Sequence, residues 1–169
     1  TEAEPIILKA NEDEGFLSWG HLKMDATTGS NLLKHVIIDG ATDGEHPVHD
    51  RAALTAWFSD IEIDYATLID NLSNPIYAEH SNVVLTHSVI HSDVTGDLIN
   101  VKYGTGLIEG CSFFGNSAVD TDAIDYDQVV GGVIRDTEIH SFYGLNSDGI
   151  DLGEESENVL IEGCLIHHC

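Results

Sequence analysis

The chain has 169 residues and carries 30 Asp and Glu against 6 Lys and Arg, which gives a formal net charge of −24 at pH 7. Nucleic acid and anionic membrane surfaces are recognised by basic patches, so this charge disfavours both partners. A hydrophobic share of 42% is typical of a folded protein. No apolar run reaches the roughly 18 residues of a membrane-spanning helix, so we expect no membrane insertion.

Residues 1–33 are weakly patterned and are predicted to form irregular N-terminal coils or a cap, followed by regular coils over residues 34–169. The chain starts at Thr1 without a signal-peptide pattern, so we expect it to be part of a longer protein. Hydrophobic segments at 35–40 and 59–63 predict the first regular strands. Residues 51–58 between them favour a short helix inserted as a loop.

Further along the chain, four segments align in one register, at residues 82–91, 107–114, 133–140 and 158–167. A second set of short strands lies upstream of each, and three columns of apolar residues result. These columns are Leu85, Ile108, Ile134 and Ile161; Ile90, Phe113, Ile139 and Ile166; and Ile76, Ile99, Ile124 and Ile150. Followed upstream, the first column reaches Ile63 and Ile38 at spacings of 22 to 27 residues.

A repeat of this length predicts turns of short strands that stack about 4.8 Å apart in parallel ladders, with the apolar columns inside. Leucine-rich and helical repeats are disfavoured, because their consensus residues and a 3.6-residue period are absent. The predicted fold class is therefore all-β, a right-handed parallel β-helix solenoid of about seven coils.

A column of small residues, Ser88, Cys111, Thr137 and Cys164, suits a tight internal bend between two strands. Its two cysteines are two coils apart, about 9 to 10 Å at the strand spacing, which is too far for a disulfide. We expect free, buried thiols.

Segments 5–8, 19–22 and 31–39, together with the Asp-rich coils at 121–127 and 147–152, resemble the pectate-lyase-like β-helix superfamily. Within it they are similar to bacterial surface modules that accompany spore-coat-kinase-like and lamin-tail domains. The resemblance implies an extracellular or cell-surface location. The two Asp-rich coils also look like the calcium-binding coils of one class of pectate lyases.

If Ile124 and Tyr126 point inward, Asp125 and Asp127 point outward and Asp151 lies beside Asp125 in the next coil. Like charges about 4.8 Å apart repel by roughly 0.9 kcal/mol in water, and Ca²⁺ with its six to eight oxygen ligands would relieve this. The alternative is a solvated acidic ladder. The predicted ligands are Asp122, Asp125, Asp127, Asp148, Asp151 and Glu154.

A lyase or epimerase would also need a base on this face. Lys102 is the candidate, because it occupies the column of Asp127 one coil earlier. In the lyases that the chain resembles, the base lies downstream of the calcium coils, beyond the last residue of this sequence.

Histidines form another column, in which His140 and His167 are neighbours and His91 lies beyond Phe114. Two cysteines and two histidines also close the chain at residues 164–169, but their spacing matches no zinc motif. We interpret the histidine column as stacked surface imidazoles.

The sequence therefore predicts an extracellular, calcium-stabilised scaffold or a carbohydrate-contacting surface module without catalysis of its own. One alternative is a polysaccharide lyase or epimerase fragment acting on acidic glycans, so an acidic polysaccharide is the expected partner. Another is a structural subunit of a filament or surface layer that self-associates through uncapped β-helix ends.

Overall fold

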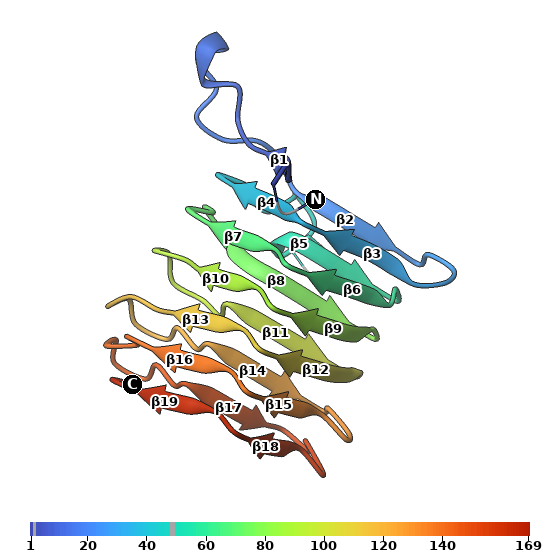
Figure 1. Ribbon diagram of the computed structural model, residues 1–169, viewed down its shortest axis with the longest axis vertical. Helices are drawn as coiled ribbons and strands as arrows, with labels where there is room; N and C mark the ends of the chain where they lie inside the picture. The colour runs from blue at the N-terminus through green and yellow to red at the C-terminus, as the bar shows by residue number, and fades with distance from the viewer. Residues whose placement is uncertain (2, 48–49) are drawn as a thin grey trace.

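A computed structural model describes residues 1, 3–47 and 50–169, and it winds them into one elongated stack of strands (Figure 1). The fold is all-β, a parallel β-solenoid of about six turns, which confirms the predicted class of an all-β parallel solenoid, for which about seven coils were expected. One 3-10 helix, η1 (Glu12–Glu14), lies in the segment that projects beyond the first turn in Figure 1. The described residues include no helix long and apolar enough to cross a membrane.

Three parallel sheets run along the solenoid axis, and each turn adds one strand to each sheet. Sheet 1 consists of β1 (Ile6–Leu8), β4 (Val36–Asp39), β7 (Thr67–Ile69), β10 (Val89–His91), β13 (Ser112–Phe114), β16 (Glu138–His140) and β19 (Leu165–His167). Sheet 2 consists of β2 (Leu22–Asp25), β5 (Ala52–Trp57), β8 (Asn74–Glu79), β11 (Ile99–Lys102), β14 (Ile124–Asp127) and β17 (Ile150–Gly153). Sheet 3 consists of β3 (Asn31–Lys34), β6 (Ile61–Asp64), β9 (Asn82–Thr86), β12 (Thr105–Glu109), β15 (Val133–Arg135) and β18 (Leu160–Glu162).

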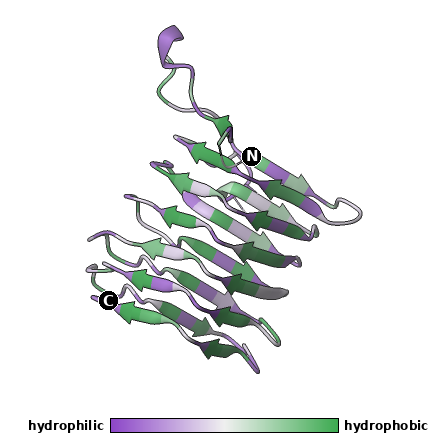
Figure 2. Cartoon of the chain, in the orientation of Figure 1, coloured by the Kyte–Doolittle hydropathy of each residue, from purple (hydrophilic) through white to green (hydrophobic). Residues whose placement is uncertain are grey.

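The three apolar columns are present as predicted, one in each sheet. Ile108 pairs with Leu85 and Ile134 in sheet 3, and Phe113 pairs with Ile90 and Ile139 in sheet 1. The third column follows sheet 2 through Ile76, Ile99, Ile124 and Ile150. These side chains form one continuous core along the axis, and Figure 2 shows the hydrophobic colour concentrated in the strands.

The upstream end of the first column was assigned wrongly. Ile63 pairs with Leu33, whereas Ile38 pairs with Leu68 and so belongs to sheet 1. Residues 31–40 contain two strands separated only by His35, and the spacing of 25 residues from Ile38 to Ile63 imitates the repeat. Ile38 and Ile63 are therefore one repeat apart along the chain, although they lie in different sheets.

Residues 51–58 are also not a helix. Residues 52–57 form strand β5, which pairs with β2 on one side and β8 on the other. All residues from Ala52 to Ala56 are buried, so both faces of β5 are covered. Alanine favours helix in isolation, but here the ladder hydrogen bonds and the burial of both faces outweigh that preference.

From Tyr65 onward, each corner between sheet 3 and sheet 1 takes one residue in the left-handed conformation and then one small residue. Tyr65 and His87 have φ values of 52° and 48°, and Ala66 and Ser88 follow them. The Ser88 hydroxyl accepts the N–H of Ala66 at 3.0 Å, and the Thr137 hydroxyl accepts the N–H of Cys111 at 3.3 Å. The column of small residues therefore forms the internal bend that the sequence predicted, and its cysteines are free.

The strands of the last turn pair on one side only, so their inward-column residues are partly uncovered. Ile161 and Ile166 belong to the buried columns but are 43% and 44% exposed. Self-association through this face stays a prediction.

Candidate functional site

The acidic coils lie on the outward side of sheet 2, on strands β14 and β17. Asp125 and Asp151 are register partners, so their backbones are adjacent. Asp122 accepts the backbone N–H of Asp148 on its Oδ1 at 2.6 Å. Tyr126 points into the core, as predicted.

The other two predicted ligands are placed differently. Asp127 is buried and forms an ion pair with Lys102 of the previous turn. Glu154 lies in the exposed turn after β17. Among residues 1, 3–47 and 50–169, no three His, Cys, Asp or Glu side chains are grouped so that they could hold a metal ion. The six carboxylates are thus neighbours along the face, without forming one ligand shell.

Burial strongly raises the pKa of two carboxyls on this face, those of Asp125 and Asp122. It raises the pKa of Asp125 to about 7, and the charges of Asp97 and Asp127 add to the effect while Lys102 opposes it. Burial also raises the pKa of Asp122 to about 6, against the hydrogen bond from the N–H of Asp148. These two carboxyls therefore hold protons at much higher pH than an ordinary Asp.

Lys102 occupies the predicted column, as the register partner of Asp127. Burial lowers the pKa of its ammonium, but the hydrogen bond and charge of Asp127 outweigh burial, so the net pKa is raised. A lysine that acts as a base must first lose this proton. The ion pair therefore works against the role that a lyase would give Lys102.

The predicted histidine column is present on sheet 1. The rings of His91 and Phe114 stack at 4.2 Å between centroids, those of Phe114 and His140 at 6.0 Å, and those of His140 and His167 at 5.2 Å. Each ring belongs to the last residue of its strand in sheet 1, and neighbouring rings are stacked nearly parallel.

A second row of rings was missed by the sequence analysis. It follows the left-handed corner residues and consists of His35, Tyr65 and His87, with centroids 5.3 and 4.7 Å apart. Gly110 is next in this column, where a Cβ would lie 3.3 Å from Cδ2 of His87, so the row ends there. The available signal was the recurrence of an aromatic or imidazole ring directly after each of the first three strands of sheet 3, at positions 35, 65 and 87.

Asp64 fixes this second row in place. Its carboxylate lies 2.5 Å from Nζ of Lys34 and 3.0 Å from Nδ1 of His87. It also accepts a hydrogen bond from the hydroxyl of Thr86 at 2.8 Å. Burial would raise the pKa of Asp64, but these hydrogen bonds lower it to about 2. Lys34 also lies over the ring of Tyr65, 5.6 Å from its centroid. The ionised Asp64 thus holds the ring of His87 through its Nδ1.

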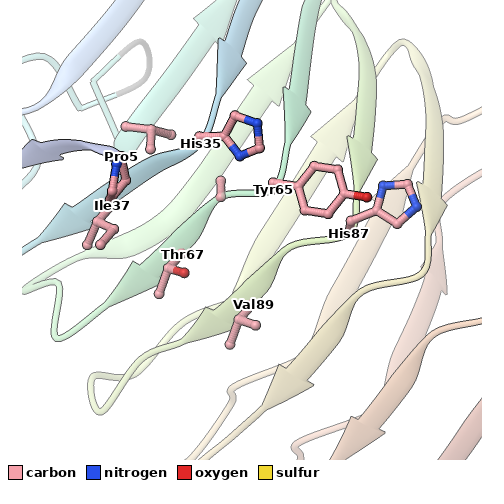
Figure 3. A pocket seen from close by; sticks show the side chains of 9 residues that line it. Pro5, His35, Ile37, Tyr65, Thr67, His87 and Val89 are labelled. Carbon is pink, nitrogen blue, oxygen red and sulfur yellow. The ribbon is translucent and has the colours of Figure 1, made fainter. Parts of the chain in front are cut away.

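A pocket of about 220 Å³ runs beside this row (Figure 3). One wall is the row of His35, Tyr65 and His87. The other is an outward column of sheet 1, formed by Ile37, Thr67 and Val89 on three successive strands. The pocket therefore crosses three turns parallel to the solenoid axis and combines polar ring edges with aliphatic groups.

Comparison of the chain with protein-family models, with curated proteins and with solved structures finds no match.

Proposed function

We propose that the protein is an extracellular scaffold module that contacts carbohydrate in the pocket between the ring row and sheet 1. The observation that supports this is the pairing of a polar wall with an aliphatic wall along one straight pocket. Sugars present hydroxyls at their edges and C–H groups on their faces. The Tyr65 hydroxyl and the His87 Nε2 edge suit the hydroxyls, and Ile37 and Val89 suit the C–H faces.

The charges around the pocket favour an uncharged glycan. Lys34, which lies over the ring of Tyr65, is paired with Asp64 at 2.5 Å, and the whole chain carries a net charge of −24. An acidic glycan would meet repulsion without a free positive partner. We therefore propose a neutral polysaccharide chain that lies parallel to the axis, in place of the acidic glycan expected from the sequence.

The test compares two tyrosines that have the same backbone conformation. Tyr65 lies in the pocket and Tyr103 lies at another corner, with φ values of 52° and 54° and exposures of 45% and 50%. Both rings stack on a histidine, at 4.7 Å for Tyr65 on His87 and 4.8 Å for Tyr103 on His80. We expect a panel of neutral and acidic polysaccharides to show binding to a neutral member, with at least tenfold loss in Tyr65→Gly and none in Tyr103→Gly.

Binding that is equally weakened by both variants would contradict the pocket as the site. An absence of binding across the panel, with wild-type folding intact by circular dichroism, would contradict carbohydrate contact itself.

Calcium binding by the acidic coils is a separate proposal. Its centre would be the register pair Asp125 and Asp151, because Asp127 is already neutralised by Lys102. Carboxylate oxygens are the ligands that Ca²⁺ prefers, and water would complete its shell.

A further inference from the structure

The pocket beside the ring row is built from the same three-residue segment in three successive turns. Each segment has a ring residue in the left-handed conformation, then a corner residue, then an outward residue of sheet 1. The segments are His35–Val36–Ile37, Tyr65–Ala66–Thr67 and His87–Ser88–Val89. Thr67 is the register partner of both Ile37 and Val89, so equivalent side chains are aligned along the axis. Both walls of the pocket therefore repeat once per turn (Figure 3).

The spacing of this repeat is nearly constant. The ring centroids of His35 and Tyr65 lie 5.3 Å apart, and those of Tyr65 and His87 lie 4.7 Å apart. On the other wall, neighbouring strands of sheet 1 are separated by about 4.8 Å, as in any β-sheet. A ligand that contacts both walls in the same way in all three turns must therefore repeat along a straight line with nearly the spacing of the strands.

The repeat ends after three turns. Upstream, Pro5 takes the position of a further ring residue, since Ile6 pairs with Val36, and it lines the end of the pocket. Downstream, Gly110 takes the ring position and Ser112 continues the outward column as the partner of Val89. The residues that line the pocket include neither of these two. The pocket thus has three equivalent positions along its length.

An extended β-1,4-linked chain of pyranose sugars has a matching repeat. Where both glycosidic bonds leave the ring equatorially on opposite sides, the chain is straight and advances per sugar by close to the spacing of neighbouring strands, about 4.8 Å. Chains with α-1,4 or β-1,3 linkages curve instead. Only part of a curved chain would stay between two straight walls.

The pocket also alternates as such a chain does. Successive sugars of a straight β-1,4-linked chain are turned over, so the first and third present the same edge and the second presents the opposite edge. In the pocket, the first and third turns combine a histidine with an aliphatic side chain, Ile37 or Val89. The middle turn combines two hydroxyls, those of Tyr65 and Thr67, which can both donate and accept hydrogen bonds.

We propose that the pocket binds three consecutive sugars of a neutral β-1,4-linked chain, one sugar per turn, with the middle sugar between Tyr65 and Thr67. This inference rests on the proposed function, because it concerns the same pocket, and it adds the linkage, length and register of the ligand. Longer chains extend beyond the pocket without further contact.

NMR titration with oligosaccharides of two to six sugars tests linkage and length. The probes are β-1,4-linked series of glucose, mannose, xylose and N-acetylglucosamine, compared with α-1,4-linked and β-1,3-linked glucose series. In the β-1,4-linked series that binds best, we expect affinity to rise about fivefold to tenfold from two to three sugars, the effect of about one further hydrogen bond. From three to four sugars it should rise at most about twofold, because four sugars can occupy three positions in two registers. The other linkages should bind about tenfold more weakly or worse.

Thr67→Val tests the register, and Ser112→Ala is its matched control. Both variants remove a hydroxyl from the same outward column of sheet 1, at the middle of the pocket for Thr67 and one turn beyond it for Ser112. We expect Thr67→Val to weaken binding of the three-sugar probe by about fivefold, as the loss of one hydrogen bond implies. Ser112→Ala should leave the affinity for chains of three to six sugars unchanged.

Three results would overturn the arrangement of one sugar per turn while leaving carbohydrate contact in place. They are equal affinity for all linkages, a steady rise in affinity beyond three sugars, and equal effects of Thr67→Val and Ser112→Ala. Failure of every neutral probe to bind the folded wild type, in all three linkages and as polysaccharide, would instead contradict the proposed function itself.

Discussion

Polar atoms within the solenoid are satisfied mainly by the neighbouring turn, and Tyr126 is an exception. Its side chain is fully buried on the inward side of β14, and its hydroxyl has no hydrogen-bond partner among the described residues. The ring lies against Gly106, where a Cβ would come within 2.2 Å of the Tyr126 oxygen. Glycine at 106 therefore makes room for the hydroxyl without providing it a partner.

Tyr126→Phe is expected to stabilise the protein by about 1 kcal/mol, because it removes a buried hydroxyl that has lost water without gaining a partner. Tyr77→Phe is the contrasting variant, since the Tyr77 hydroxyl donates to Glu79, and it is expected to destabilise by about 1 kcal/mol. The midpoints of urea unfolding measure both changes. A loss of stability in Tyr126→Phe as large as in Tyr77→Phe would show that the buried hydroxyl has a partner after all.

The ionised Asp64 makes the stability of the protein depend on pH. Its folded pKa, about 2, lies below the ordinary value of 3.8, so its contribution is complete above pH 3.8 and is lost as pH falls towards 2. Asp64→Asn removes the anion that holds His87 and Lys34. We expect a lower Tm than wild type at pH 6 and a smaller difference at pH 2.5. A difference that does not shrink in acid would mean that packing, not charge, fixes the row of rings.

The corners show how the elements are joined. A side-chain hydroxyl at the small-residue position accepts a backbone N–H of an adjacent turn, so the corner carries a buried hydrogen bond in addition to the strand ladders. Thr137 illustrates this, because it is 1% exposed and accepts the N–H of Cys111. Each such residue links successive turns.

Thr137→Val keeps the shape of the side chain but leaves the Cys111 N–H without an acceptor, so we expect a loss of about 1 to 3 kcal/mol. Thr105→Val is the control, since Thr105 is exposed and its hydroxyl donates to the side chain of Asn82 at 2.8 Å. It should change stability by about 0.5 kcal/mol or less. Equal effects of both variants in urea unfolding would contradict a special role for the corner bond.

An element could be predicted from the sequence where its local pattern is regular. From Asn74 onward, each turn repeats three short strands with inward apolar residues, so three columns and their register could be predicted. Strand β5 could not, because its alanine-rich segment favours helix, and only its pairing with β2 and β8 and the burial of both faces make it a strand. The Lys102 column was also predictable, but the ion pair with Asp127 depends on side-chain direction and burial.

The pocket was beyond prediction for a similar reason. The row of His35, Tyr65 and His87 uses positions with positive φ, which bulky residues rarely occupy. Nothing in one turn indicates that three such residues stack. Only the closed solenoid places the row beside Ile37 and Val89 of sheet 1.

At the scale of the whole molecule, the stack is a linear array in which each turn contacts mainly its neighbours, so local repulsion adds up along the axis. Most of its acidic side chains, which give the net charge of −24, lie outside the apolar core. Salt is therefore expected to stabilise the protein by screening alone, whatever the cation. A specific calcium effect must be measured above that background.

The last prediction compares NaCl with CaCl₂ at equal ionic strength and at pH 8, where Asp125 has lost its proton according to its pKa of about 7. If Asp125 and Asp151 bind Ca²⁺, CaCl₂ raises the Tm above the NaCl value, because a ligand that binds only the folded state stabilises it. Asp151→Asn should remove most of this increment. Glu12→Gln, which removes one charge from the exposed η1 segment at the other end of the stack, should retain it. At pH 5 the increment should also shrink, since calcium then competes with the proton on Asp125. Identical melting in both salts would leave screening as the only effect of cations and would exclude calcium as a stabilising ligand of this face.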